Sequence, residues 1–377
     1  MRKNFSLFVV FSVSVILLIF GLFLVYGCGT QPTGNGTPAA PIWTITTVTS
    51  EGDVGYSSSL ALTSVGTPCI VYEVINPSSD INYTKWNASL ATWEFQSVGN
   101  GGYYKELALT SSDNPRTAFW ETGSAKIKYA SSDGGPWSLS DVANSTVPYQ
   151  HVHIVLNSSD YPIVAFTGKT STTTVAVVAE WNGGSWDITS VESINVGLME
   201  NFALAIKNDI PALALIDVDN ADLYYATKEG TSWNLMLVDS NQINYADPVD
   251  IAYNPVTGYP AIVYVSGPPV SGPGTIKFAE WNGSSWQFQT ISSDRSDRFF
   301  SLAFDSSGNP RVCWTRSTAL RYAVRSGSSW NVWNVRDASN ELQGQDISLA
   351  IDANDKSHIS FYNLESSAND LCYGYIP

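Results

Sequence analysis

The chain has 377 residues, enough for a sizeable core, and its 34 acidic and 19 basic side chains give a formal net charge of −15 at neutral pH. This charge disfavours a nucleic acid or an anionic membrane surface as the main partner, because both repel an acidic protein. Trp, Tyr and Phe make up 12% of the chain, only 14% is charged, and 28 glycines and 18 prolines favour turns, which is typical of a loop-rich all-β protein.

Residues 1–28 are predicted to export or anchor the chain. A basic start precedes an apolar run from Phe5 to Val25, the pattern of a secretion signal or a membrane anchor. The run ends in Val-Tyr-Gly-Cys, which resembles the lipobox of bacterial lipoproteins and implies lipidation of Cys28. Tyr26 departs from the usual lipobox residue, so an uncleaved anchor stays an alternative. Both interpretations place the rest of the chain outside the cytoplasm, at the cell surface or in the periplasm, and attached to the membrane only through this segment.

Residues 29–41, GTQPTGNGTPAAP, are too polar and too rich in Gly and Pro to pack, so they are predicted to be a flexible linker. Seven copies of one unit follow, over residues 42–377. Short apolar stretches alternate in each copy with turns rich in Gly, Asn and Ser, which predicts four short strands per copy. One turn residue marks every copy, at spacings of 47, 47, 49, 49, 50 and 47 residues: Pro68, Pro115, Pro162, Pro211, Pro260, Pro310 and Ser357.

A fourth-strand Trp recurs in only six of the seven copies, because the seventh copy stops after its third strand at Pro377. The missing strand precedes the first copy as PIWTITTVTS, with Trp43. We therefore expect the N-terminal strand to complete the last copy, which a closed ring needs and a linear solenoid does not. The sequence predicts an all-β fold, a seven-bladed β-propeller with four antiparallel strands per blade. The six recurring residues are Trp93, Trp137, Trp186, Trp233, Trp286 and Trp330.

The second strand of each copy alternates a small with a bulky residue, which predicts that the bulky face of one blade packs into the small face of its neighbour. The bulky positions are Tyr72, Phe119, Phe166, Leu215, Tyr264, Trp314 and Phe361. The small positions are Val71, Ala118, Ala165, Ala214, Val263, Cys313 and Ser360. Cys69, Cys313 and Cys372 fall in predicted strands and are interpreted as buried apolar residues, with one disulfide between adjacent blades left open.

Ligands of propellers usually meet the face formed by the loops that lead into the first strands and out of the second strands. Aromatic rings beside carboxylates, amides and Arg suit sugars, because the rings stack on the apolar sugar face and the polar groups bond the hydroxyls. Any propeller rim of this composition would look similar, so the prediction of a site is not specific. The predicted ligand-binding residues of these loops are Tyr103, Tyr104, Trp120, Glu121, His151, Asp247, Arg298, Arg316 and Tyr362.

Polar side chains are also predicted around the axis. His151 and His153 point to one side of a first strand, and the position of His153 is taken by Glu106 and by Asp250 in other blades. Such a set could hold a divalent metal, but seven-fold geometry would spread it too far for one ion, so a polar, water-filled channel without a metal is the preferred interpretation. Paired carboxylates here could instead hydrolyse glycosides. No cofactor motif is present.

Loops between the third and fourth strands, such as EWNGGSW (Glu180–Trp186) and EWNGSSW (Glu280–Trp286), resemble the Asp-box turns of sialidase-type propellers. Only Asp133 supplies the Asp, and the Arg motif that grips the sialidase substrate is absent, so the resemblance implies fold and not catalysis. The whole repeat also resembles lectin-type propellers and bacterial surface proteins. Its repeated residues are structural and its rim residues vary, which favours at most one composite site over seven equal sugar pockets.

No recognisable set of catalytic residues is present, which favours binding over catalysis. We therefore predict an extracytoplasmic, membrane-tethered binding module that recognises a glycan or protein partner through its loop-lined face. Two alternatives stay open: a glycoside hydrolase or lyase that uses the axial carboxylates, and a structural or assembly protein without a small ligand. A monomer is expected.

Overall fold

The computed structural model describes residues 38–76, 79–121, 123–145, 147, 151–197, 201–240, 243, 248–267, 274–293, 298–316, 319–336, 343–365 and 369–377. The predictions for residues 1–28, for lipidation of Cys28, for most of the linker and for Asp247 lie outside these residues. Beyond Pro38 the chain forms one compact unit, Ala39–Pro377. Over the described ranges, no helix is long and apolar enough to cross a membrane.

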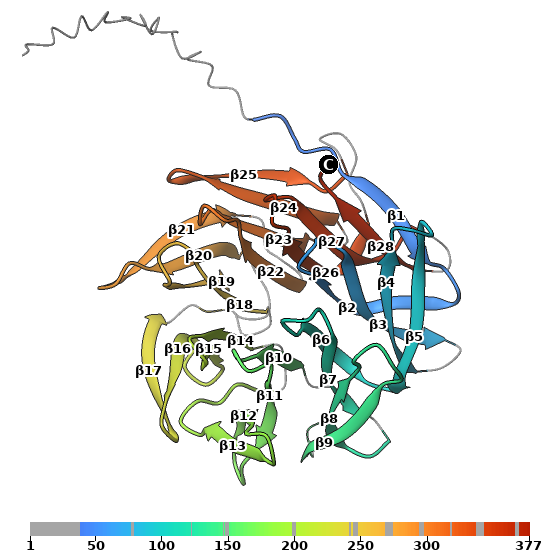
Figure 1. Cartoon of the computed structure of the whole chain (residues 1–377). Coiled ribbons are helices and arrows are strands. Elements are labelled where there is room, and N and C mark those ends of the chain that lie inside the picture. Colours follow the sequence, from blue (N-terminus) through green and yellow to red (C-terminus); the bar gives the residue numbers. More distant parts are fainter. Residues whose placement is uncertain are drawn as a thin grey trace, which may run out of the picture. The chain divides into compact units, whose positions relative to one another are not determined.

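Seven antiparallel sheets of four strands make up this unit, arranged as blades around an axis with the first strand of each blade innermost (Figure 1). Blade 1 contains β2 (Asp53–Leu62), β3 (Pro68–Asn76), β4 (Asp80–Asn87) and β5 (Thr92–Asn100). Blade 2 contains β6 (Tyr103–Leu109), β7 (Pro115–Glu121), β8 (Lys126–Ser131) and β9 (Ser138–Asn144). Blade 3 contains β10 (Val152–Leu156), β11 (Pro162–Lys169), β12 (Thr174–Trp181) and β13 (Trp186–Val191).

The remaining blades repeat this order. Blade 4 contains β14 (Phe202–Lys207), β15 (Ile210–Asp217), β16 (Asp222–Glu229) and β17 (Ser232–Asp239). Blade 5 contains β18 (Asp250–Tyr253), β19 (Pro260–Ser266), β20 (Thr275–Trp281) and β21 (Trp286–Ser292). Blade 6 contains β22 (Arg298–Phe304), β23 (Pro310–Arg316), β24 (Ala319–Ser326) and β25 (Ser329–Asn334). Blade 7 contains β26 (Gly344–Ile351), β27 (Ser357–Asn363), β28 (Asp370–Tyr375) and β1 (Thr44–Thr49).

The ring closes as predicted, because the N-terminal strand is the outer strand of the last blade. β1 pairs antiparallel with β28, with Thr44 opposite Tyr375. The ring of Trp43, directly before β1, meets the edge of Tyr322 in blade 6 at 5.2 Å between centroids. Blade 7 thereby obtains both its fourth strand and the Trp that its own repeat lacks. The two ends of the unit are held in one sheet.

The predicted packing of large into small side chains is confirmed. All seven bulky positions of the second strands are at most 3% exposed, and all seven small positions are fully buried. Val263 of blade 5, for example, packs in one cluster with Trp314 of blade 6, and Ala165 of blade 3 packs with Leu215 of blade 4. Cys69, Cys313 and Cys372 are free and buried. The core of the protein therefore consists of seven interfaces between blades.

Candidate functional site

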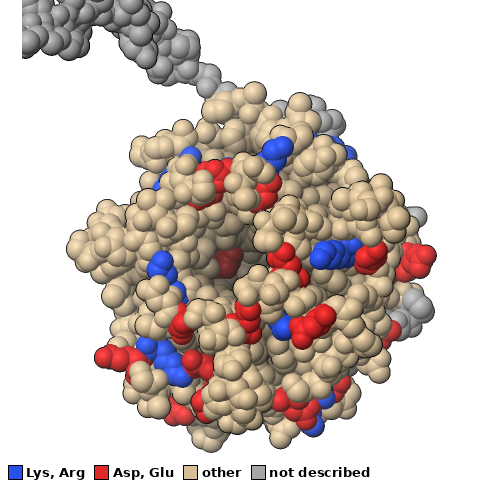
Figure 2. Space-filling model, in the orientation of Figure 1, with Lys and Arg blue, Asp and Glu red and all other residues tan. Residues whose placement is uncertain are grey.

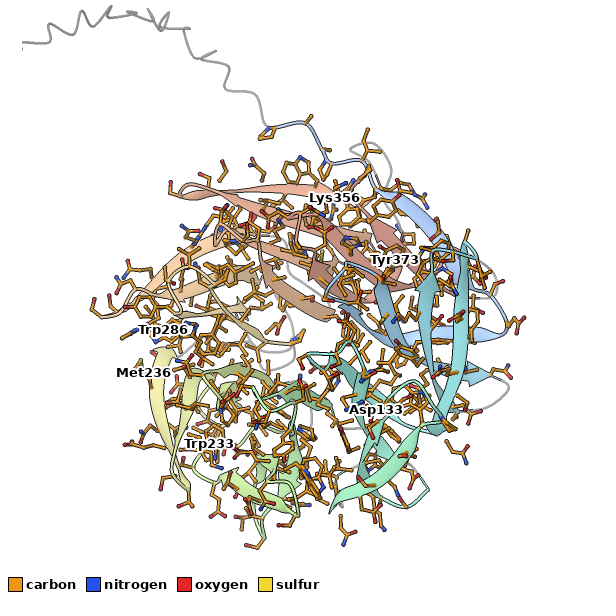
Figure 3. The ribbon with its side chains drawn as sticks, viewed as in Figure 1. Asp133, Trp233, Met236, Trp286, Lys356 and Tyr373 are labelled. Atoms are coloured by element: carbon orange, nitrogen blue, oxygen red, sulfur yellow. The ribbon has the colours of Figure 1, made fainter. Side chains whose placement is uncertain are left out.

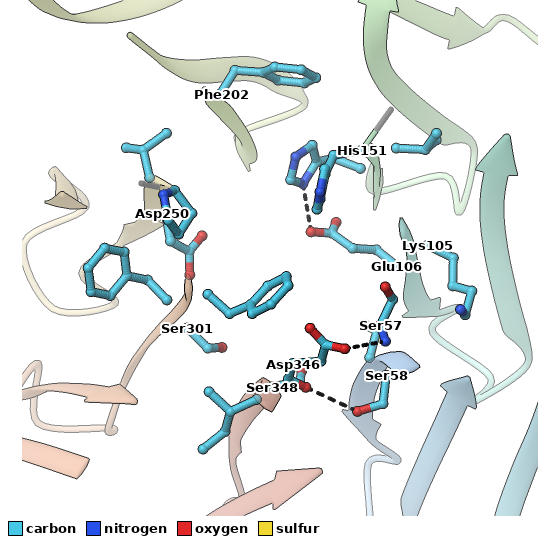
Figure 4. A pocket seen from close by; sticks show the side chains of 18 residues that line it. Ser57, Ser58, Lys105, Glu106, His151, Phe202, Asp250, Ser301, Asp346 and Ser348 are labelled. Atoms are coloured by element: carbon cyan, nitrogen blue, oxygen red, sulfur yellow. Dashed lines mark hydrogen bonds and ion pairs between the residues drawn. The ribbon is translucent and has the colours of Figure 1, made fainter. Parts of the chain in front are cut away.

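The first strands surround a pocket on the axis, which Figure 2 shows as a hollow in the middle of the ring with acidic side chains in and around it. The pocket has a volume of about 140 Å³. Four of the predicted residues line it, and they come from three blades: Glu106, His151, His153 and Asp250. Asp346 of blade 7 adds a carboxylate that the sequence analysis did not select. The close-up in Figure 4 shows Glu106, Asp250 and Asp346 around one space.

β-Bulges shape the wall of this pocket. The register of the first and second strands shifts between Tyr56 and Ser59, between Arg298 and Phe300, and between Gln345 and Ser348. Within these bulges Ser57, Phe299 and Asp346 have φ values of 48°, 52° and 56°, a conformation that side chains other than Gly seldom adopt. A bulge re-aims the side chain that it carries. Alternation along the strand therefore does not predict which residues reach the pocket.

One position of the first strand also joins the blades to each other. In blades 1, 2, 5, 6 and 7 its side chain accepts a hydrogen bond from a backbone N–H of the next blade. Glu106 Oε2 accepts from Ile154 at 3.1 Å, and Asp250 Oδ2 accepts from Leu302 at 2.7 Å. Ser59, Ser301 and Ser348 make the same bond to Leu107, Leu349 and Leu60. The predicted polar channel is thus also a ring of inter-blade bonds.

Glu106 has a second partner inside the pocket. Its Oε1 lies 2.6 Å from Nδ1 of His153, and a carboxylate can only accept, so the Nδ1–H of the imidazole donates. The His153 ring meets the edge of Phe202 in blade 4 at 5.1 Å between centroids. Glu106 therefore fixes the orientation of His153 between blades 3 and 4.

Two ionisable groups at the axis have shifted pKa values. Burial raises the pKa of Asp250 to about 7, although the N–H groups of Leu302 and Ile251 oppose this, and the negative charge of Glu106 raises it further. Burial lowers the pKa of Lys105 to about 8, against the stabilising charge of Glu73. Lys105 Nζ lies 3.7 Å from Glu73 Oε2 and donates to the carbonyl oxygen of Tyr56 at 3.3 Å. This pair is almost fully buried, with side-chain exposures of 0% and 1%.

Four of the other predicted binding residues do not line the pocket. Trp120 is 7% exposed and packs in the cluster between blades 2 and 3, and Tyr362 is 4% exposed with its hydroxyl bonded to Asp53, so neither ring has a face open to a ligand. Glu121 lies 3.6 Å from Lys128 of its own blade, and Arg316 is exposed at the end of β23. Tyr103, Tyr104 and Arg298 lie in β6 and β22, where only their backbone is described.

The axial groups are not arranged around one metal ion. Among the described residues, no three His, Cys, Asp or Glu side chains are placed so that they could bind one metal together. The set of Glu106, His153 and Asp250 therefore does not form a metal centre in the described chain.

Larger grooves lie at the outer side of the ring, between neighbouring blades. Described residues line grooves of about 610 Å³ between blades 7 and 1, 390 Å³ between blades 2 and 3, and 470 Å³ between blades 4 and 5. Pockets that hold small ligands are usually about 300–1,000 Å³, so the three grooves fall in that range and the axial pocket falls below it. Figure 3 labels Met236 and Trp286 in the groove between blades 4 and 5, and Tyr373 in the groove between blades 7 and 1.

Each groove contains the same aromatic triad. Two Trp side chains of one blade meet edge to face: Trp86 with Trp93 at 5.5 Å, Trp181 with Trp186 at 5.3 Å, and Trp281 with Trp286 at 5.6 Å. The second Trp of each pair then meets a Tyr of the preceding blade, which is Tyr373 at 5.5 Å, Tyr129 at 5.9 Å or Tyr225 at 5.7 Å. The three triads agree within a few tenths of an ångström. The first Trp of each pair remains partly exposed.

An Asn after the first Trp holds the loop that joins the pair. Asn182 Oδ1 accepts from the N–H groups of Gly184 and Ser185, at 3.0 and 2.9 Å. Asn282 does the same for Ser284 and Ser285, and Asn87 for Ser89 and Leu90. The first and last residues of the loop are thereby paired directly across the two strands, Trp181 opposite Trp186. This Asn takes the position that Asp133 has in the corresponding loop of blade 2.

The second Trp was used in the sequence only as the recurring residue of the fourth strand, and no role was predicted for the first. In the structure each second Trp contacts the preceding blade. The signal that was missed is Trp-Asn at the start of the loop, which occurs in blades 1, 3 and 5 and is replaced in blade 4 by Lys228-Glu229 and in blade 6 by Arg325-Ser326. The neighbouring blade supplies the Tyr, which a repeat-by-repeat comparison cannot show.

No family model and no curated protein sequence matches this chain. Solved structures do match in fold. The SapL1 lectin in complex with α-methyl fucoside matches with a TM-score of 0.54 at 13% identity, over 76% of this chain and 99% of the lectin. The polysaccharide lyase Uly1 matches with a TM-score of 0.54 at 10% identity, over 92% and 94% of the two chains. AofleA from Arthrobotrys oligospora matches with a TM-score of 0.51 at 12% identity, over 78% and 89%. At these identities the likeness establishes the propeller fold.

Proposed function

We propose that this protein is an extracytoplasmic carbohydrate-binding module that holds saccharides in the three grooves between blades. The observation that carries the proposal is the triple recurrence of the triad of two Trp and one Tyr, each at the wall of a groove of about 390–610 Å³. A triad that only stapled the blades would not need its first Trp. That residue extends the aromatic surface into the groove in alternate blades.

The chemistry of the grooves suits a sugar ring. The apolar C–H face of a pyranose stacks on Trp and Tyr, while hydroxyls need polar partners at the edge. Between blades 4 and 5 these partners are Lys207, Lys228, Glu229 and Asn234, and between blades 2 and 3 they include Arg116 and Asp160. The exposed Tyr161 and Tyr259 occupy equivalent positions in these two grooves. The grooves are therefore amphipathic, as saccharide sites are.

The structural neighbours support saccharides as the ligand class, since SapL1 is a lectin in complex with a fucoside and Uly1 is a polysaccharide lyase. The axial carboxylates support binding over hydrolysis. Glu106 bonds His153 and Ile154, and Asp250 bonds two backbone N–H groups, so both serve as links between or within blades. The predicted leader and Cys28 would place the grooves outside the cell membrane, where polysaccharides are met.

The test is a glycan array probed with the full chain in a detergent that has no sugar headgroup. A confined set of glycans is expected to bind. Trp86→Ala, Trp181→Ala and Trp281→Ala each remove one partly exposed Trp and leave its partner packed on the preceding blade, so each should lower affinity for a monovalent hit about ten-fold in its own groove. The triple variant should bind nothing, whereas Phe288→Ala removes an exposed aromatic residue outside the grooves and should bind normally.

Two results would overturn the proposal. A folded chain that binds no glycan on the array would direct the search to a protein partner. Binding that survives the triple variant would move the saccharide site away from the grooves. Release of reducing ends or unsaturated uronates from a bound polysaccharide would instead support the hydrolase or lyase alternative.

A further inference from the structure

The axial pocket is a second, separate site. It lies on the innermost strands, whereas the grooves lie between the outer strands, and the two share no lining residue. A water molecule needs roughly 10–15 Å³ of such space, so about 140 Å³ holds about ten waters or one small organic molecule. The ligand that this pocket selects follows from the charges and rings on its wall.

The wall carries more negative than positive charge. Glu106, Asp250 and Asp346 line the pocket from blades 2, 5 and 7 (Figure 4). Lys105 also lines it, but its charge lies against Glu73 in the buried pair. Asp346 Oδ2 accepts the N–H of Ser57 at 2.9 Å, and Asp250 accepts the N–H groups of Leu302 and Ile251. Over the described residues no Lys or Arg forms an ion pair with Asp250.

Ser57 gives an independent indication of a ligand. It is 93% buried, its side chain lines the pocket, and its Oγ has no hydrogen-bond partner among the described residues. A buried hydroxyl without a partner costs about 1–3 kcal/mol, so its retention on the wall needs a reason. This oxygen is buried from the pocket, so the Ser57 side chain must rotate before a donor in the pocket can satisfy it. Ser57 lies in the bulge of β2, and Asp346 lies in the bulge of β26. The two residues are hydrogen-bonded to each other.

A metal ion does not fit this wall, because no three of its ligands come together in the described chain. Phe202, Phe299 and Phe300 also line the pocket and add apolar surface to it, with Phe202 and Phe300 buried and Phe299 partly exposed. Carboxylates beside apolar surface match a cation with a carbon skeleton, since its charge can reach an acid while its carbons contact the apolar surface.

We propose that the axial pocket binds a small organic molecule that carries a protonated amine. An ammonium group has three donors and no acceptor, which matches a wall of carboxylate oxygens and the Ser57 hydroxyl. The site goes beyond saccharide binding in the grooves and does not depend on it. An amino sugar and an aliphatic diamine share this chemistry, and both fit the size of the pocket.

The full chain should be titrated calorimetrically with glucosamine and with putrescine, and with the neutral matches N-acetylglucosamine and 1,4-butanediol. Heat of binding is expected for at least one amine and for neither neutral compound. The amine that binds shows whether the ligand is an amino sugar or an aliphatic diamine. Asp250→Asn should weaken that binding at least about ten-fold, because it removes a full charge from the wall. Asp141→Asn changes an acid in β9, the outermost strand of blade 2, and should leave the binding of the amine unchanged.

Putrescine binding should also strengthen between pH 5.5 and pH 8 if putrescine is the active amine, since Asp250 ionises in that range while an aliphatic amine stays charged. Glu106, Asp346, His151, His153 and Lys105 face the same space, so the comparison with Asp250→Asn isolates the contribution of Asp250. Equal binding of the neutral compounds, no binding of either amine, or full binding by Asp250→Asn would each overturn the proposal. An unchanged circular-dichroism spectrum shows that a variant is folded.

Discussion

Ser158 of blade 3 binds Asp209 of blade 4 through two hydrogen bonds, from its backbone N to Oδ1 and from its Oγ to Oδ2, each 2.6 Å long. Three further turn pairs repeat this clasp: Ser64 with Asp113, Ser111 with Asp160 and Ser306 with Asp355. The Ser stands four residues before the turn marker, and the Asp of the next blade stands two residues before its own marker. The Asp residues all have φ near 60°.

The three remaining junctions have Gly where the clasp needs Asp. These residues are Gly66, Gly258 and Gly308, with φ between 72° and 79°. The preceding blades lack the Ser as well, and carry Ala353, Lys207 and Val256 in its place. Ser and Asp are thus present together or absent together at every junction. The Ser and the Asp therefore form one motif, and we expect it to form at another junction when both residues are introduced there.

Gly66→Asp combined with Ala353→Ser should build a fifth clasp, at the junction between blades 7 and 1 where the ring closes. A Cβ at Gly66 would meet no heavy atom closer than 3.9 Å, and Asp already adopts this backbone conformation in four blades. A rise of about 1–3 °C in Tm is expected for the double variant, because exposed hydrogen bonds contribute little. Differential scanning calorimetry measures it. A double variant no more stable than Gly66→Asp alone would contradict the pairing of the two positions.

Closure by Trp43 is a second target for mutation. The ring is 6% exposed and packs in the cluster between blades 6 and 7. Trp43→Ala should lower the free energy of unfolding by about 3–5 kcal/mol, the usual cost of truncating a buried Trp. Urea unfolding followed by fluorescence measures the change. Ile42→Ala, at a neighbouring residue that is 73% exposed, should cost almost nothing, and equal effects of the two variants would mean that the strand alone closes the ring.

The buried pair of Lys105 and Glu73 allows a double-mutant cycle. Lys105→Met leaves the Glu73 charge buried without its cation and should cost about 3–5 kcal/mol. The raised pKa of Glu73 and the lowered pKa of Lys105 both have burial as their largest cause, so desolvation outweighs the attraction of the pair. Glu73→Leu in the Lys105→Met background should therefore recover most of the loss. A double variant as unstable as Lys105→Met would show that the pair itself is required.

The sequence was sufficient to predict the blades, their number and their closure, because those depend on features that each repeat carries by itself. The turn marker, the alternation of Val71 with Tyr72 and the position of Trp43 are local signals. The sequence was not sufficient to predict which residues line the pocket and the grooves. Trp120 was predicted at the rim, yet blade 3 covers it, and Asp346 was overlooked although a bulge turns it inward. How far one blade covers the next is a property of the assembled ring.

The grooves illustrate the same limit. Trp181 and Trp186 belong to one repeat, but the Tyr129 that completes their triad lies in the preceding blade, more than fifty residues before Trp181 in the chain. Only the closed ring shows that Trp86, in the first copy, has its Tyr in the last copy, at Tyr373. A periodic search for Trp-Asn followed by Trp would have found the loops, without showing what completes them.

Asp250 should make the stability of the protein depend on pH. Its pKa is about 7 in the folded chain and about 3.9 when unfolded, so between these values the folded state holds a proton that the unfolded state has lost. The free energy of unfolding must therefore fall as pH rises through this window, and the contribution of Asp250 is fully present below about pH 4 and lost above about pH 7. The urea midpoint should be higher at pH 5 than at pH 8.

Asp250→Asn removes this titration and keeps an oxygen that can accept one of the two N–H groups. At pH 5 the urea midpoint of this variant should lie below that of the unmodified chain, because one inter-blade bond is weakened. Between pH 5 and pH 8 the midpoint of the variant should fall less than that of the unmodified chain. Lys105 titrates in both proteins, so its contribution cancels in the comparison. The Asp141→Asn variant, changed in the outermost strand of blade 2, should show the same fall of the urea midpoint with pH as the unmodified chain. Parallel profiles for the Asp250→Asn variant and the unmodified chain would assign the pH dependence to other groups.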